Sequence, residues 1–431
     1  MIKLLMIISR LAFGLLFIFA GFIKGVDPIG TALKIKEYIG VFHLDAIDFM
    51  SIPLALALTC FEFLIGVAIL KGLRMEFFSK VGLAFISCFT ILTLWIAIAN
   101  PVSDCGCFGE AIHLSNWGTF IKNLFLLAAA LIIFINRKKF HHIAKPAIER
   151  GYLVIYALLI IGLQIYSIRN IPQIDFGIYK PGTDLVAQHQ QMQEREYETT
   201  FIYSKDGKEE TFTINDLPDS TWTYVDAKTV LVRGAAEDAS VDFSFIDAEG
   251  NSIGNEIVEK NGPVFFISIY NVRALGNKAI EKIMNLADTL YNHNLKLYII
   301  SASSVEQTQE LFAPYEEDAG RTFDVLYSDY KAVISFNRSS GGLTYVNNGI
   351  IIKKWARGNY PDDIEKILEE DPEIITATTR IEEHLFAEIS LFVILCLIMI
   401  IRFISKIIYN NTLLKKVIAE SIEDDETPVE Q

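Results

Sequence analysis

Two cysteines separated by one glycine are the residues of this chain whose types and spacing best suit chemistry. Cys105, Gly106 and Cys107 lie in residues 104–110, a short polar stretch between two long apolar runs. A Cys-Gly-Cys pair can close a very small disulfide ring, and glycine tolerates the backbone dihedrals that such a ring needs. Strained, exposed disulfides tend to be oxidising and labile rather than structural. The spacing therefore favours a thiol–disulfide redox site at Cys105 and Cys107.

Two other interpretations of this motif remain open. The cysteines could be free thiols at a turn, or half of a metal site completed by His113. The metal interpretation is the least favoured, because no second Cys or His pair at ligand spacing accompanies the motif. The remaining cysteines, Cys60, Cys88 and Cys396, lie inside apolar runs and are expected to behave as small hydrophobic residues.

Long apolar runs predict a membrane protein. The chain has 431 residues, of which 52% are hydrophobic, and a run of about 20 apolar residues is long enough to cross a bilayer. The predicted spans cover about residues 4–23, 51–70, 77–99, 118–136, 151–168 and 386–407. The first run is expected to be an uncleaved anchor, because it is long and no small-residue cleavage site follows it. Residues 28–48 predict a short helix at the membrane surface.

Basic residues in the short loops predict the orientation of these spans, because Lys and Arg are enriched on the cytoplasmic side. The basic residues are Lys71, Arg74 and Lys80, then Arg137, Lys138, Lys139, Lys145 and Arg150, and finally Arg402, Lys406, Lys415 and Lys416. They share one side if the inner membrane of a bacterium is crossed six times with both termini in the cytoplasm. The Cys-Gly-Cys loop and residues 169–385 then face the periplasm, an oxidising compartment in which a functional disulfide can persist.

Two ionisable residues, Arg10 and Glu62, fall within the apolar runs. Intramembrane charges are costly and normally pair inside the bundle. Glu62 is expected either to carry protons at a quinone-linked site or to form a structural pair with Arg10. For Arg10 the structural role is favoured, through that pair or by reaching to the inner surface.

Beyond residue 169 the composition changes to that of a soluble domain. A stretch rich in Pro and Gln, 170–195, predicts a linker. Alternating patterns predict a β-hairpin at 199–214, a strand at 223–232 and a second hairpin at 242–253. From residue 263, strand and helix patterns alternate and end in a hairpin and a helix, which favours an α/β sandwich.

The predicted domains follow from these patterns. They are a helical bundle (1–140), a fifth span (150–168), a linker and hairpin region (169–240), an α/β domain (241–372), a last span (386–407) and an acidic cytoplasmic tail (408–431). The formal charge of −14, combined with basic inner loops, argues against nucleic acid as a partner. The bilayer and a periplasmic protein are the expected partners.

The membrane half, about residues 1–140, resembles the DoxX/MauE superfamily of small bundles of about four helices. The residues that carry this resemblance are Arg10, Gly14, Ala20, Gly21, Lys24, Asp27, Pro28, Glu62, Leu64, Gly66 and Leu70. Residues 104–109 are similar to the loop of the MauE branch, which is associated with disulfide formation in a periplasmic dehydrogenase. The resemblance implies an all-α membrane bundle of about four helices, to which this chain adds two further spans.

Residues 240–370 look like a thioredoxin-like or peroxiredoxin-like domain, with a flavodoxin-like or other α/β domain as the alternative. The resemblance lies in the entry hairpin at 242–250, the core strand at 263–270 and the closing hairpin at 349–355. Where that family places Cys-x-x-Cys, this chain has residues 271–275 without a thiol. Thiol exchange needs a thiolate, and residues 169–385 contain no cysteine, so this domain is expected to be a binding module.

Two functions are compatible with these features. The first is a redox-associated membrane protein in which Cys105 and Cys107 take electrons from a substrate thiol and Glu62 assists proton transfer, with a quinone as the acceptor. The alternative is a non-catalytic scaffold, in which the bundle anchors a degenerate thioredoxin-like domain that binds an envelope partner. A transporter is supported only by the intramembrane charges Arg10 and Glu62.

Overall fold

The computed structural model describes most of the chain. The described residues are 2–140, 146–193, 196–205, 208–213, 216–219, 221–233, 245–259, 261–316 and 323–390, with single residues between 392 and 407. The chain divides into two compact units, a helical unit (1–177, 355–361 and 374–431) and an α/β unit (178–354 and 362–373). Half of the predicted last span at 386–407, and the whole tail at 408–431, lie outside the described residues.

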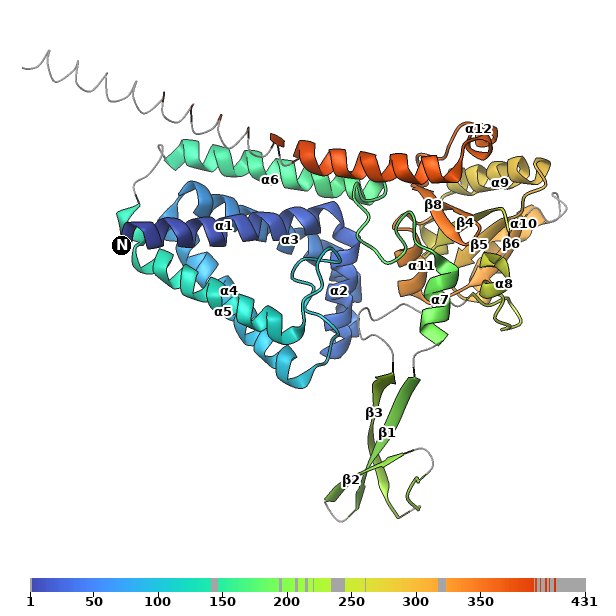
Figure 1. Cartoon of the computed structure of the whole chain (residues 1–431), viewed down its shortest axis with the longest axis horizontal. Helices are drawn as coiled ribbons and strands as arrows, with labels where there is room; N and C mark the ends of the chain where they lie inside the picture. The colour runs from blue at the N-terminus through green and yellow to red at the C-terminus, as the bar shows by residue number, and fades with distance from the viewer. Residues whose placement is uncertain are drawn as a thin grey trace, which may run out of the picture. The chain divides into compact units, whose positions relative to one another are not determined.

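The helical unit contains five helices that are long and apolar enough to cross a membrane. They are α1 (Ile2–Val26), α3 (Ser51–Lys71), α4 (Met75–Ala99), α5 (Asn116–Ile135) and α6 (Pro146–Arg169), as Figure 1 shows. A 3₁₀ segment, η1 (Asp45–Met50), leads directly into α3, and α2 (Pro28–Val41) precedes it. The first five predicted spans are therefore confirmed as helices, and the mixed segment after the first span is helical as expected.

The helices α1 and α3 pack antiparallel at very short range, because glycines stand where their backbones meet. A Cβ atom at Gly21 would lie 2.8 Å from the Cβ atom of Phe63 and 2.9 Å from its Cα atom. Across the same contact, a Cβ atom at Gly66 would lie 2.7 Å from the backbone nitrogen of Ile18. Small residues at helix contacts are what allow membrane helices to approach this closely. The pairing of these residues sets one register along the whole contact.

The loop between α4 and α5 is closed at its base by side chains at the two helix ends. At the end of α4, Asn100 adopts a left-handed conformation, which asparagine tolerates better than most residues. Asn116, the first residue of α5, donates hydrogen bonds to the Asn100 side chain (2.7 Å) and to the Val102 carbonyl oxygen (3.0 Å). Ser115 caps α5 by accepting from the Gly118 N–H, at 3.1 Å. The two ends of the Cys-Gly-Cys loop are thus held together.

The α/β unit is built on a five-stranded sheet with strand order β6-β5-β4-β7-β8. The strands are β4 (Pro263–Ile269), β5 (Leu297–Ser301), β6 (Phe323–Tyr327), β7 (Gly342–Asn347) and β8 (Ile350–Trp355). β4 pairs in parallel with β5 and antiparallel with β7. The helices are α8 (Gly254–Val258), η3 (Val272–Ala274), α9 (Asn277–Asn292), α10 (Val305–Glu316), α11 (Tyr330–Phe336) and α12 (Ile364–Glu369).

Every strand and helix that the sequence predicts between 263 and 370 is present, within a few residues at each end. The helix α11 was not predicted, because its seven residues complete barely two turns and show no clear periodicity. Its N-terminal signal was present, since Asp329 accepts a hydrogen bond from the Ala332 N–H at 3.0 Å.

A separate three-stranded sheet has the order β2-β1-β3. Its strands are β1 (Glu196–Lys205), β2 (Lys208–Thr213) and β3 (Thr223–Arg233). The antiparallel pairing of β1 and β2 confirms the first predicted hairpin. Of the second predicted hairpin, residues 242–244 lie outside the described residues, and the described part contains a single antiparallel bridge between Ile246 and Ser252.

The predicted linker at 170–195 is wrong over its second half. Tyr179 and Leu185 are 0% and 2% exposed and belong to the hydrophobic core of the α/β unit. Asp184 forms an antiparallel bridge with Ile350 of β8, and the Gln-rich run forms the helix α7 (Leu185–Gln193). The apolar residues in this segment are too widely spaced to reveal burial by periodicity, so only the pairing with β8 identifies the segment as part of the domain.

The α1–α3 contact predicts a difference between two glycine substitutions. Gly21→Ala should lower the thermal stability of the purified protein, because the new methyl group meets the Phe63 backbone and overpacking costs about 1–3 kcal/mol. Gly162→Ala in α6 is the matched control, since a Cβ atom there meets nothing within 4 Å and alanine favours a helix by about 1 kcal/mol. Unfolding temperatures in detergent measure both effects. Equal shifts for the two variants would contradict the close α1–α3 contact.

Candidate functional site

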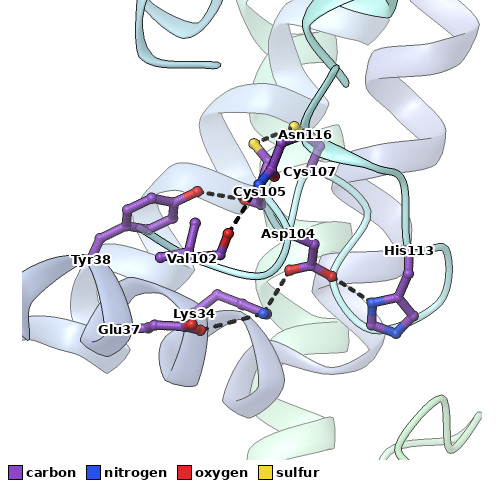
Figure 2. A network of polar contacts seen from close by, with 9 residues as sticks. All are labelled: Lys34, Glu37, Tyr38, Val102, Asp104, Cys105, Cys107, His113 and Asn116. Atoms are coloured by element: carbon purple, nitrogen blue, oxygen red, sulfur yellow. Dashed lines mark hydrogen bonds and ion pairs between the residues drawn. The ribbon is translucent and has the colours of Figure 1, made fainter. Parts of the chain in front are cut away.

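The Cys-Gly-Cys loop brings its two thiols into contact. The sulfur atoms of Cys105 and Cys107 lie 2.8 Å apart, with both cysteines in the free thiol state. Figure 2 shows the two sulfurs side by side at the tip of the loop, above Asp104. The pair is less exposed than the polar sequence around it suggested. Cys105 is 8% exposed and Cys107 is half-buried, because the loop folds back onto α1 and α2 instead of extending into solvent.

Asp104 anchors the loop through two charged partners. Its carboxylate accepts from the Lys34 ammonium of α2 at 2.6 Å and contacts Nδ1 of His113 at 2.5 Å (Figure 2). Lys34 also reaches Glu37 at 3.3 Å. Burial alone would raise the pKa of Asp104, but the hydrogen bond and charge of Lys34, followed by those of His113, hold this pKa below its ordinary value. The anchor is therefore a charged network at neutral pH.

The backbone of the loop is fixed by α2 and by one glycine. The Tyr38 hydroxyl donates a hydrogen bond to the carbonyl oxygen of Cys105 at 3.0 Å. Gly106 has a φ of +66°, and a Cβ atom there would lie 3.0 Å from Cγ of Lys34. The left-handed conformation and the close approach to Lys34 both favour glycine at this position. The glycine predicted to permit a tight Cys-Gly-Cys turn thus has the backbone conformation that such a turn needs.

A buried ion pair lies within the bundle next to the loop. The Lys24 ammonium of α1 contacts Oε2 of Glu62 at 2.5 Å, and these residues are 4% and 7% exposed. The stem of Lys24 passes under the loop, since a Cβ atom at Gly109 would lie 4.0 Å from Cγ of Lys24. A buried charge pair requires close geometry to offset its desolvation. Glu62 is therefore placed beside the cysteine loop.

Of the two alternatives for Glu62, the structural pair with Arg10 is wrong, because Glu62 pairs with Lys24. Arg10 donates instead to the carbonyl oxygens of Ile69 (3.1 Å) and Leu70 (3.0 Å) at the end of α3, and its guanidinium lies over the Phe140 ring. The antiparallel register of α1 and α3 explains the difference. Gly21 meets Phe63, so Glu62 lies beside the C-terminal part of α1, where Lys24 stands, and Arg10 lies at the far end of that contact.

The two thiols differ in acidity. A hydrogen bond from the Cys105 thiol lowers the pKa of Cys107 to about 6, with further lowering by the ammonium groups of Lys122 and Lys24 against the effects of burial and Glu62. The pKa of Cys105 is raised, first by its hydrogen bond to Cys107 and then by burial. In the reduced loop, Cys107 is the thiolate and Cys105 is the thiol that donates to it.

Four residues around the loop were not predicted as site residues. They are Lys24, Lys34, Tyr38 and Lys122. Lys34 and Tyr38 carry a detectable signal, because their i, i+4 spacing puts both on one face of α2. The metal interpretation of His113 receives no support. Within the described ranges, no three His, Cys, Asp or Glu side chains are grouped to hold a metal ion, and His113 contacts Asp104.

The α/β unit offers a different kind of surface at the place where a thioredoxin-like protein carries its thiols. The turn after β4 forms η3, and the Asn271 side chain accepts from the Arg273 N–H at 3.1 Å. A cavity of about 390 Å³ lies between this turn, the start of α9 and α10. Its lining includes Arg273, Asn277, Gln307 and Glu310. These side chains can bind polar groups, and none can exchange thiols.

Comparisons with known proteins agree with this division. Residues 2–136 match the family model "Methylamine utilisation protein MauE", and residues 197–234, which span most of β1 to β3, match a domain of unknown function, DUF8463. No match was found among the curated proteins.

Three solved structures are similar to part of the chain. A candidate electron transfer protein from Aquifex aeolicus VF5 is 14% identical, covering 30% of this chain and 90% of its own, with a TM-score of 0.24. A candidate thioredoxin from Neisseria meningitidis is 21% identical, covering 29% and 81%, with a TM-score of 0.23. BsSco, a member of the Sco family of cytochrome c oxidase assembly proteins, is 14% identical, covering 33% and 92%, with a TM-score of 0.23.

The strand order of the α/β unit identifies its fold. A central β4 with a parallel neighbour on one side and an antiparallel neighbour on the other, followed by the β7–β8 hairpin and a closing helix, is the arrangement of thioredoxin-like domains. The antiparallel β7 excludes the all-parallel sheet of a flavodoxin-like domain. The chain is a multi-pass membrane protein with a MauE-like helical domain and a thioredoxin-like α/β domain.

Proposed function

We propose that this protein is a membrane-bound thiol–disulfide oxidoreductase whose working groups are Cys105 and Cys107. The observation that carries the proposal is the 2.8 Å contact between their sulfur atoms in a loop that is anchored at both ends. Two thiols held this close can be joined by a disulfide with little rearrangement. The working surface is the periplasmic face of the bacterial inner membrane, in agreement with the distribution of basic loops.

In the proposed reaction, Cys107 forms the bond to the client. It is more exposed than Cys105, and it is the thiolate of the pair. A client thiolate attacks the sulfur of Cys107, the Cys105–Cys107 bond breaks, and Cys105 leaves and takes up a proton. A second client thiolate then attacks the mixed disulfide, releasing Cys107 as a thiolate. The client loses two electrons and two protons, and the loop gains both electrons.

The direction of this exchange follows from the acidity of Cys107. A thiol whose pKa is lowered is stabilised in the reduced loop, and stabilising the reduced form makes the disulfide a stronger oxidant. With the pKa of Cys107 lowered to about 6, the loop disulfide is suited to oxidising client thiols. It would be a poor structural crosslink for the same reason.

Regeneration of the loop disulfide needs an acceptor for two electrons. We assign this role to a quinone of the bilayer, which takes up two electrons from the loop, one proton released by Cys105 and one proton from water to become a quinol. Glu62, paired with Lys24 beside the loop, is a buried carboxylate whose charge acts on Cys107. Its role in the proposal is to accept the proton of Cys105 as the disulfide forms again.

A scaffold function is the second candidate. It is supported by the thioredoxin-like domain, which has no cysteine between residues 169 and 385 and carries a cavity lined by Arg273, Asn277, Gln307 and Glu310. In the redox proposal this domain binds the client; in the scaffold alternative, binding is the whole function. Cysteine variants distinguish the two, because only the redox function requires Cys105 and Cys107.

The reduced protein should show an unusually acidic thiol. Alkylation of Cys107 by iodoacetamide, followed by peptide mass spectrometry, should reach half its maximal rate near pH 6, because only the thiolate reacts. In the unfolded protein the same cysteine should titrate near its ordinary pKa of about 8.5. The same midpoint in folded and unfolded protein would rule out the proposed thiolate.

The reduction potential of the pair tests the function itself. Thiol trapping across a glutathione redox series should give one reversible transition on the order of −120 to −200 mV, the range of known oxidases. Cys105→Ser should accumulate a glutathione mixed disulfide on Cys107, and Cys107→Ser should accumulate far less on the buried Cys105. Cys88→Ser should keep the wild-type transition. The scaffold function is favoured if no intramolecular disulfide forms, or if the disulfide has a reduction potential below about −300 mV.

The proton role of Glu62 requires a variant that leaves no buried charge unpaired. The double substitution Glu62→Gln with Lys24→Met removes both charges, whose effects on Cys107 oppose each other. We expect oxidation of the loop by a short-chain quinone to slow at least about tenfold, the lower range for lost acid–base catalysis. The glutathione midpoint should stay within experimental error. An unchanged oxidation rate would assign the ion pair a structural role only.

A further inference from the structure

Three lysines from three different helices surround the Cys-Gly-Cys loop, and two of them have carboxylate partners. Lys24 of α1 is paired with Glu62, and Lys34 of α2 is paired with Asp104. Lys122 of α5 differs from both. Across the part of the chain that the structure describes, its ammonium group forms no ion pair. Its positive charge is therefore not neutralised by a neighbouring carboxylate.

The position of Lys122 is set by the base of the loop. Asn116 ties the start of α5 to the Val102 carbonyl oxygen at 3.0 Å, and Lys122 stands six residues further along the same helix. Its Nζ atom lies 4.5 Å from the centroid of the Phe108 ring, next in sequence to Cys107. The Phe108 ring is itself buried and packs against Phe19 with centroids 5.8 Å apart. The ammonium group is thus held at the cysteine pair rather than free to move along the surface.

We propose, on the basis of the redox function above, that Lys122 is a positioning residue whose ammonium group is the counter-ion of the Cys107 thiolate in the reduced loop. When the client has been oxidised, the loop has gained two electrons and one proton. Cys105 is then a thiol and Cys107 is a thiolate. The new negative charge forms near an ammonium group that lies over the Phe108 ring and has no ion-pair partner among the described residues. Formation of this pair stabilises the reduced loop and so makes the disulfide more oxidising.

The physical argument rests on the half-buried position of Lys122. A half-buried ammonium group has lost part of its hydration, and a cation–π contact with a phenylalanine ring offsets only part of that loss. An anion that appears beside such a group is stabilised more than one beside an ammonium already paired with a carboxylate. Lys24 and Lys34 are so paired, which leaves Lys122 as the residue that responds to the redox state.

The charged and titratable groups that interact with Cys107 come from the loop and from four helices. They are Cys105 of the loop, Lys122 of α5, Lys24 of α1, Glu62 of α3 and Tyr38 of α2. The Lys24 and Glu62 charges oppose each other at Cys107. Removing Lys122 therefore removes a positive charge that forms no ion pair with a carboxylate among the described residues.

The test compares three substitutions in the full-length protein. Lys122→Met removes the charge and keeps the side-chain length, Lys122→Arg keeps the charge, and Lys80→Met removes an exposed lysine near the start of α4. Two quantities are measured for each variant: the midpoint of the glutathione redox series, and the pH at which Cys107 alkylation is half-maximal. If Lys122→Met does not yield folded protein, Lys122→Gln serves for the same comparison.

We expect Lys122→Met to become less oxidising, with the loop–glutathione equilibrium shifted about tenfold toward the loop disulfide, which corresponds to about 30 mV. Alkylation should slow about fivefold at pH 6 and remain unchanged at pH 9, since a tenfold weaker acid has fewer thiolates only near its pKa. Lys122→Arg should restore both values, and Lys80→Met should leave both unchanged. If Lys122 had a purely structural role, Lys122→Met would not produce a shift of the glutathione midpoint that Lys122→Arg reverses.

The proposal is overturned if Lys122→Met keeps the wild-type midpoint and pH profile while the wild-type loop forms a reversible disulfide. It is also overturned if Lys122→Arg behaves like Lys122→Met. Failure of the redox function is a separate result, recognised by the absence of a reversible Cys105–Cys107 transition in the wild-type protein itself.

Discussion

The close antiparallel contact between α1 and α3 is the constraint on which the rest of the helical unit depends. Because Gly21 and Gly66 lack side chains, the two helices approach until backbone meets backbone, and this fixes a single register. That register puts Lys24 opposite Glu62 and leaves Arg10 at the end of α3. A shift by one helical turn would separate Lys24 from Glu62 and leave two unpaired charges in the bundle.

Ion pairs and hydrogen bonds to neighbouring side chains hold the Cys-Gly-Cys loop in place, rather than regular secondary structure within the loop. Asp104 is held between Lys34 and His113, and the Cys105 carbonyl oxygen is held by Tyr38. The two thiols differ in acidity first because of their mutual hydrogen bond, with burial and the ammonium groups of Lys122 and Lys24 acting in addition. Two cysteines that are equivalent in the sequence thereby acquire distinct roles, one as a half-buried thiolate and one as a buried thiol.

The thioredoxin-like domain has the fold of a thioredoxin but no cysteine with which to exchange thiols. Its sheet is complete, and the segment around Tyr179 and Leu185 adds to its core from outside the expected boundary. The turn after β4 holds Asn271 and Arg273 in place of cysteines, beside a cavity with polar lining. A domain with such a surface is suited to binding, and both cysteines of the Cys-Gly-Cys loop lie in the MauE-like domain.

The sequence by itself determined a large part of this protein. Apolar runs defined the five described spans, because a bilayer demands about 20 apolar residues from each helix. Alternating residues predicted the strands of the three-stranded sheet, apolar strands between helical patterns predicted the five-stranded sheet, and the Cys-Gly-Cys spacing identified the candidate site. These features are local, and the periodicity and composition of a sequence encode local structure.

Only the tertiary structure decided which distant residues meet. The sequence offered Arg10 as the partner of Glu62, and helix register chose Lys24. It offered a linker at 170–195, and pairing with β8 made its second half part of a core. Lys122 gave no signal of its own, because its contact with the Phe108 ring joins α5 to a loop residue 14 positions earlier in the chain. Such contacts depend on how helices and strands pack, and packing joins residues whose separation along the chain carries no period.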